Sequence, residues 1–229
     1  MAQMLLKTDS AAKVERAVRR HLRLAKRTGN AKAVELAERI VAPAAAQTSA
    51  TAAAATAREG VEDTFDDWSK TDAALDRLIK RGHRRCVDFD ADHPGAGTAP
   101  LLFGGEPPSA ITNARREDEP DIVAKLVARG AKLPADHPAT PLLAELTTAA
   151  QASRTAERAW IDAHQNAEAT AGAVEVARLA VIGQYRDNFI DIGRAAGADV
   201  AEACFPTLRR GGSGAGDDSN DVEDPTKTT

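Results

Sequence analysis

Two stretches of the sequence carry small or apolar residues at spacings that alternate between four and three. The first stretch contains Val61, Phe65, Trp68, Asp72, Leu75, Ile79, Gly82 and Cys86. The second contains Leu142, Leu146, Ala149, Ser153, Ala156, Trp160, Ala163 and Ala167. This heptad rhythm places each set along one side of an α-helix that packs against another helix at a shallow angle. No segment alternates apolar and polar residues for long enough to predict a strand, so we expect an all-α fold.

Capping residues and helix breakers divide the chain into two long helical hairpins. The first hairpin, 10–87, begins at Ser10, which is a predicted N-cap. A crossover rich in proline and glycine follows over 88–139 and holds one predicted short helix, about 121–129. The crossover therefore separates two helical regions of similar length.

The second hairpin, 140–205, begins at Thr140, and we expect a turn at Gly172 between its two helices. Two such hairpins predict an elongated four-helix bundle over residues 1–208. The remaining residues, 209–229, combine glycine and serine with five acidic residues. This composition cannot bury a core and predicts a disordered acidic tail.

Composition excludes several classes of protein. The 229 residues carry a formal net charge of −4, which argues against a chain wholly devoted to nucleic acid. No apolar run approaches the roughly 18 residues of a transmembrane helix, and the N-terminal residues lack the features of a secretory signal. The two cysteines, Cys86 and Cys204, are too few for a disulfide framework or a cysteine-based zinc site. We expect a cytoplasmic protein with reduced thiols.

The first predicted helix carries a strongly basic face. On a helical wheel of about 100° per residue, seven basic side chains fall within an arc of about 140°. They are Lys13, Arg16, Arg19, Arg20, Arg23, Lys26 and Arg27. Such a face suits phosphates, an anionic membrane surface or an acidic protein. It can also be a solvated face balanced by the acidic tail and by a second acidic cluster, Glu59, Glu62, Asp63, Asp66 and Asp67.

Polar residues inside the predicted helix seams raise a metal site as an alternative. The residues that would form it are Asp72, Glu157, Glu175, His21 and His164. The Glu-x-x-His pairs of carboxylate-bridged di-iron bundles do not occur in the sequence. We therefore expect Asp72 to form an ion pair with Arg178 or Arg186 instead, and we predict no metal and no cofactor.

The sequence contains none of the common catalytic motifs. It lacks the Gly-x-Ser-x-Gly elbow, the phosphate-binding loop and the His-Glu-x-x-His zinc motif, which predicts a protein that is not an enzyme. Small side chains bury little area, so alanine-rich helices gain from lateral association. We expect a self-associating scaffold or assembly protein, a homo-oligomer in which the basic face contacts the acidic cluster. The alternatives are an anion-binding module, for nucleic acid or an anionic membrane surface, and a metal-binding helical bundle.

Overall fold

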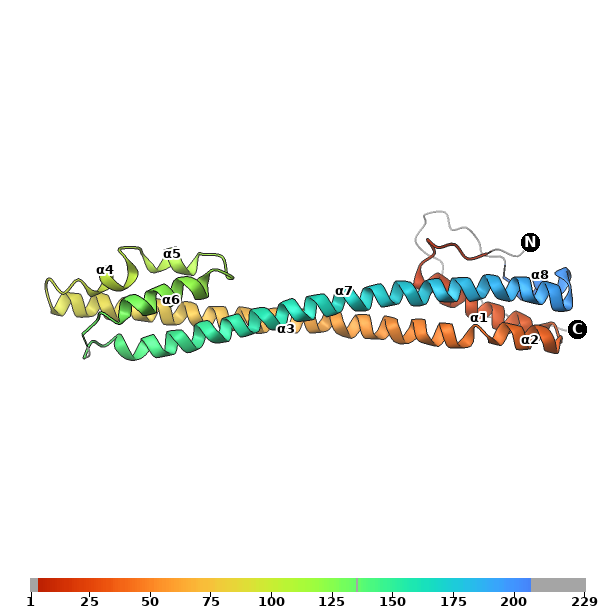
Figure 1. Cartoon of the computed structure of the whole chain (residues 1–229), viewed down its shortest axis with the longest axis horizontal. Coiled ribbons are helices and arrows are strands. Elements are labelled where there is room, and N and C mark those ends of the chain that lie inside the picture. The colour runs from red at the N-terminus through yellow and green to blue at the C-terminus, as the bar shows by residue number, and fades with distance from the viewer. Residues whose placement is uncertain (1–3, 135, 207–229) are drawn as a thin grey trace, which may run out of the picture. The chain divides into compact units, whose positions relative to one another are not determined.

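The computed structural model describes residues 4–134 and 136–206, and these residues form helices and no strand. The helices are α1 (Ala11–Arg27), α2 (Ala31–Glu38), α3 (Val41–Asp92), α4 (Thr98–Phe103), α5 (Pro108–Thr112), α6 (Glu119–Gly130), α7 (Thr140–Ala196) and α8 (Ala198–Cys204) (Figure 1). The all-α class is confirmed, and two long helices, α3 and α7, dominate the structure. Within the described residues, no helix combines the length and the apolar character needed to cross a membrane.

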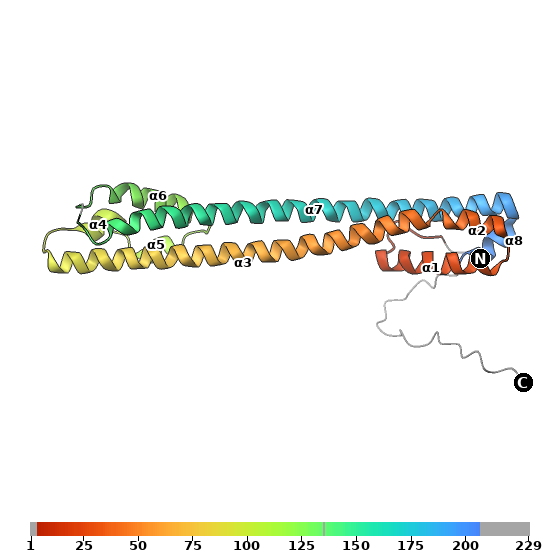
Figure 2. The same cartoon turned by 90° about the horizontal axis from the view of Figure 1, so that it is seen from below.

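The chain forms two compact units, and α3 and α7 each contribute a segment to both. Of the described residues, the first unit contains 4–47 and 177–206, and the second contains 48–134 and 136–176. The first unit therefore holds α1, α2, α8, the start of α3 and the end of α7. The second unit holds α4, α5 and α6 with the remainder of the two long helices, and α6 lies along the first turns of α7 (Figure 2).

The core of the first unit forms because α1 is amphipathic. The Ser10 side chain accepts a hydrogen bond from the backbone N–H of Lys13 and fixes the start of the helix. The side of α1 opposite the basic face is buried, with Val14 and Ala17 fully inaccessible to solvent. These residues pack with α2, α7 and α8 around Tyr185, the largest fully buried side chain.

The core of the second unit joins the crossover helices to the long pair. Leu75 and Ile79 of α3 are fully buried and form one cluster with residues of α4, α6 and α7. The first heptad seam is thus confirmed in its C-terminal part. At the start of the seam, Phe65 is 44% exposed. The residues of α4, α5 and α6 form a buried cluster only with the later part of the seam, from Leu75 onward.

The expected turn at Gly172 is absent, because α7 continues through this residue as a single helix. One glycine inside a helix costs only about 1 kcal/mol, and the surrounding alanine and glutamate residues favour the helix. The helix ends at Ala196 and is followed by Gly197, whose φ of 97° suits glycine. The prediction of a second hairpin within 140–205 is therefore wrong, and so is the prediction of four long helices in this chain.

The crossover contains three helices where the sequence predicted one. Proline starts α5, and glycines with positive φ, Gly97 and Gly104, bound α4. Both helices are short and carry no heptad pattern, so periodicity did not reveal them. The predicted tail, 209–229, lies outside the described residues.

A long part of the second unit has very little core. We call residues 48–68 of α3 and 155–176 of α7 the alanine stretch. Among these residues only Ala54, Ala57 and Trp68 are buried. Apart from Trp68 at its end, the alanine stretch therefore buries only methyl groups.

Candidate functional site

The basic face of α1 is the largest concentration of like charge that the sequence predicted, and its position is accessible. Lys13 is half-buried and the other six basic side chains are exposed. Lys13 pairs with Asp9 at 2.6 Å, and Arg19 approaches Glu15 at 3.8 Å. Within residues 4–134 and 136–206, no ion pair occupies the remaining five, Arg16, Arg20, Arg23, Lys26 and Arg27. Because these charges are not neutralised locally, the basic face is suited to an anionic partner.

The other side of α1 is fixed by a buried histidine. The Nδ1–H of His21 donates to the carbonyl of Cys204 at 2.8 Å, and Nε2 accepts from the Asn188 amide at 3.2 Å. Asn188 also donates to the carbonyl of Ala37 at 3.2 Å. Burial lowers the pKa of His21 and keeps it neutral, as this hydrogen-bond pattern requires. The network ties α1 to α2, α7 and α8, so the basic face is carried by an anchored helix.

The acidic cluster of α3 is also exposed. Glu59, Glu62, Asp63, Asp66 and Asp67 all face solvent. One of them, Asp67, pairs with Lys70 at 2.9 Å. Within the described parts of the chain, no salt bridge engages the other four. We call these five residues the acidic face.

The candidate metal ligands do not form a site. His21 belongs to the first unit, whereas His164 is an exposed residue of the second and lies 3.6 Å from Glu168. Glu157 is half-buried and Glu175 is exposed. In residues 4–134 and 136–206, no group of three or more His, Cys, Asp or Glu side chains is arranged to hold a metal ion.

Asp72 forms the ion pair that was expected, but with a different arginine. Its Oδ2 lies 3.2 Å from Nε of Arg116, in the segment between α5 and α6. The same guanidinium donates to Ser69 and lies 5.0 Å from the centroid of the Trp68 ring. The predicted partner Arg178 instead donates to the backbone carbonyls of the N-terminal segment in the first unit. Arg186, the other predicted partner, is exposed.

Beside this ion pair lies a buried carboxyl group that the sequence did not reveal. Glu119, the first residue of α6, is 3% exposed and lies within hydrogen-bonding reach of Asp72 and Asp76. Burial and these two neighbouring carboxylates raise the pKa of Glu119 to about 9. At neutral pH the Glu119 carboxyl therefore holds a proton, which it can donate to the buried and otherwise unpartnered oxygens of its neighbours.

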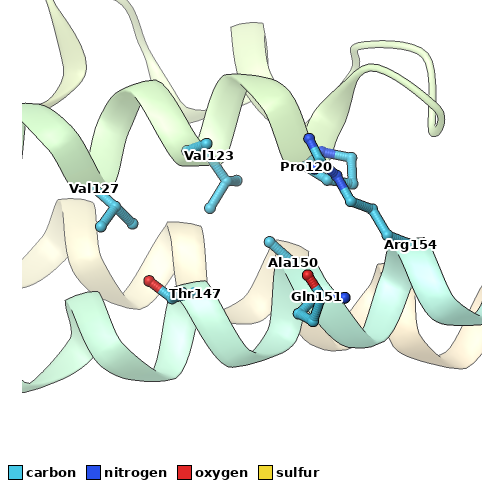
Figure 3. A pocket seen from close by; sticks show the side chains of 8 residues that line it. Pro120, Val123, Val127, Thr147, Ala150, Gln151 and Arg154 are labelled. Carbon is cyan, nitrogen blue, oxygen red and sulfur yellow. The ribbon is translucent and has the colours of Figure 1, made fainter.

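A small apolar groove runs between α6 and α7 (Figure 3). Val123 and Val127 face Thr147 and Ala150 across it, and Arg154 closes one end by pairing with Asp121. The groove has a volume of about 210 Å³. Ligand pockets for small molecules begin at about 300 Å³, so we assign this groove no ligand.

The two cysteines are free thiols in buried positions. Cys86 lies in the core of the second unit, and burial raises its pKa to about 11. Cys204 lies in the core of the first unit, and burial raises its pKa as well. Because the thiolate is the reactive form, neither residue is suited to nucleophilic chemistry.

Comparisons with known proteins do not place the chain in a family. No family model matches the sequence, and neither the curated proteins nor the solved structures include a match.

Proposed function

We propose that this protein is a non-enzymatic assembly protein that associates with copies of itself through the alanine stretch. The observation that carries this proposal is the near absence of a core along the stretch. Burial stabilises by about 25 cal/mol per Å² of apolar surface, so two helices that bury only two alanines before Trp68 at the end of the stretch gain little from each other. A second copy would supply two more helices, and the predicted four-helix bundle would then form between chains.

Exposed apolar side chains along the alanine stretch support the same proposal. Phe65 of α3 is 44% exposed, Ile161 of α7 is 39% exposed and Val176 is 70% exposed. In an isologous dimer both copies use the same surface, so these three residues would be buried in each copy. The two free buried thiols also support a reducing compartment, and we propose that the protein acts in the cytoplasm.

The charged faces supply a basis for orientation. The basic face of α1 and the acidic face of α3 carry opposite charge, and most of their side chains lack ion pairs among the described residues. Complementary charges across an interface fix register and exclude other pairings more than they add affinity. In the proposed assembly, the basic face of one copy contacts the acidic face of another.

We expect Ile161→Glu to convert the oligomer into a monomer. A carboxylate at this position would be buried without a partner in the assembly, and the penalty for such a charge is several kcal/mol. In the single chain the side chain is already partly solvated, so the fold should survive. Light scattering after size-exclusion chromatography measures the mass, and circular dichroism checks the helix content.

The matched control is Val87→Glu, which places the same charge at a 45% exposed apolar residue of α3 outside the alanine stretch. This variant should remain oligomeric. A monomeric wild-type chain, or equal dissociation in both variants, would contradict the proposal.

Reversal of charge tests the orientation separately. We expect the double variant Arg19→Glu and Arg23→Glu to weaken association at low salt, because it places carboxylates opposite the acidic face. Adding Glu62→Lys and Asp66→Lys should restore the wild-type mass, because the two faces then carry opposite charges again, with the signs exchanged. Failure of the second pair to rescue the first would show that these faces do not meet.

The second candidate function is binding of a phosphate-rich polymer such as nucleic acid. Four arginines of the basic face, Arg16, Arg19, Arg20 and Arg23, line one shallow depression, and arginine matches phosphate geometry well. Insertion into a membrane is less suitable, since the apolar side of α1 is already buried in the core. In this second case, the arginine reversal would abolish polymer binding without any change of mass.

A further inference from the structure

The C-terminal residue that the structure describes lies beside the helix that carries the basic face. Cys204 accepts the hydrogen bond from His21, and the ring of Phe205 lies 4.2 Å from the imidazole ring. Phe205 and Pro206 are both buried. The chain therefore leaves the core of the first unit at the middle of α1, on the side opposite the basic face.

The segment 217–224, which follows Arg209 and Arg210 in the sequence, is complementary in charge to that face. It contains five carboxylates within eight residues, namely Asp217, Asp218, Asp221, Glu223 and Asp224. These precede Lys227 and follow Gly211–Gly216, whose glycine and serine composition is typical of a flexible linker. In the sequence, the acidic group thus follows a glycine-rich stretch that begins five residues after Pro206.

The length of this linker is sufficient for the acidic group to reach the basic face. Ten residues lie between Pro206 and Asp217, and the eleven Cα–Cα steps from one to the other extend at most about 36–40 Å. The 17 residues of α1 span about 26 Å, and a helix is about 10–12 Å across. A Gly-rich linker of this length has a root-mean-square span of roughly 18 Å. The acidic group can therefore pass around α1 and contact any part of the basic face.

We propose that residues 217–224 bind the basic face of α1 in the same chain and shield it from other anions. Tethering by a short flexible linker gives an effective concentration in the millimolar range, so weak ion pairs are sufficient to hold the segment. The contact is intramolecular, electrostatic and reversible by salt. The contact does not depend on self-association through the alanine stretch, because it concerns one chain. It competes with the acidic face of another copy for the basic face.

Cross-linking tests the contact directly. A carbodiimide joins a lysine amine to a carboxylate in contact with it, and Lys26 supplies an exposed amine on the basic face. The full-length chain is prepared at natural isotope abundance and as ¹⁵N protein, and the two are mixed before reaction. We expect peptides that join Lys26 to residues 217–224 within one isotope form. The absence of such peptides, or mixed-isotope pairs in the proportion expected for random pairing between chains, would overturn the proposal.

Heparin affinity tests the shielding. Neutralising the segment in the full-length chain (Asp217→Asn, Asp218→Asn, Asp221→Asn, Glu223→Gln and Asp224→Asn) should tighten heparin binding about tenfold at low salt. At about 0.5 M salt the difference should disappear, because the Debye length falls to a few ångströms. Calorimetric titration with heparin at both salt concentrations measures the effect.

The matched control removes five exposed carboxylates from the second unit instead (Asp88→Asn, Asp92→Asn, Glu106→Gln, Glu117→Gln and Asp118→Asn). The control changes the net charge by the same amount as neutralisation of residues 217–224. It leaves these residues able to cover the basic face, so its heparin affinity should rise much less. Equal gains in both variants would show a general charge effect and overturn the proposal. An unchanged affinity after neutralisation of residues 217–224 would overturn it as well.

Discussion

Replacing Trp68 with alanine should destabilise the second unit by about 3–5 kcal/mol, the usual cost of removing a large buried aromatic side chain. Trp68 is 3% exposed. The centroid of its ring lies 5.3 Å from that of Trp160 and 6.4 Å from that of Phe65. Cζ of Arg116 lies 5.0 Å from the same centroid. Trp68 is the last residue of α3 in the alanine stretch and the only large buried one there. Urea unfolding followed by circular dichroism and by the fluorescence of Trp160 measures the loss.

Two further variants separate burial from ring contact. Phe65→Ala removes a ring from the same aromatic group, but this ring is 44% exposed, so we expect a loss below about 1.5 kcal/mol. Trp68→Phe should retain most of the stability, because Nε1 of Trp68 has no hydrogen-bond partner among the described residues. A loss for Trp68→Ala no larger than that for Phe65→Ala would contradict the packing described here.

Glu119→Gln should stabilise the second unit at neutral and alkaline pH, by an amount on the order of 2 kcal/mol. In the unfolded chain Glu119 ionises above its ordinary pKa of 4.5, whereas the folded chain holds the proton up to a pKa of about 9. Between these values the folded state binds more protons, so stability falls as pH rises. Glutamine donates the same hydrogen bond without a proton that can be lost, and this part of the pH dependence should vanish.

Unfolding midpoints measured from pH 5 to 9 in urea test this prediction. Glu117→Gln is the control, because Glu117 is an exposed carboxylate two residues earlier in the chain. Its midpoints should follow the wild type throughout. A Glu119→Gln chain that is less stable than the wild type at pH 8 would show that the buried carboxyl is ionised and that its charge is needed.

The sequence predicted those elements whose partners recur regularly along the chain. The seam from Leu75 to Cys86 is buried as its spacing requires, and Ser10 caps α1. The basic face is exposed because the opposite side of the same helix supplies core residues. In these cases the spacing of apolar and charged residues within one helix determines which of its sides is buried.

Tertiary partners that lie outside such patterns could not be predicted. Arg116 and Glu119 belong to an irregular connection and to the first turn of a short helix, and nothing near them in sequence indicates Asp72 as their neighbour. The continuity of α7 at Gly172 was missed for a related reason. A glycine destabilises a helix by about 1 kcal/mol relative to alanine. A glycine in a helical pattern can therefore indicate a turn, or it can be tolerated inside the helix. The length of the helix on both sides decides between them.

Each of the two buried thiols can report the opening of the unit in which it lies. Cys204 lies in the core of the first unit and Cys86 in the core of the second, and neither can react with a thiol reagent while its unit is closed. The rate at which each cysteine is modified therefore reports how often its own unit opens. A concerted opening requires equal rates, whereas unequal rates rank the kinetic stabilities of the two units within one molecule.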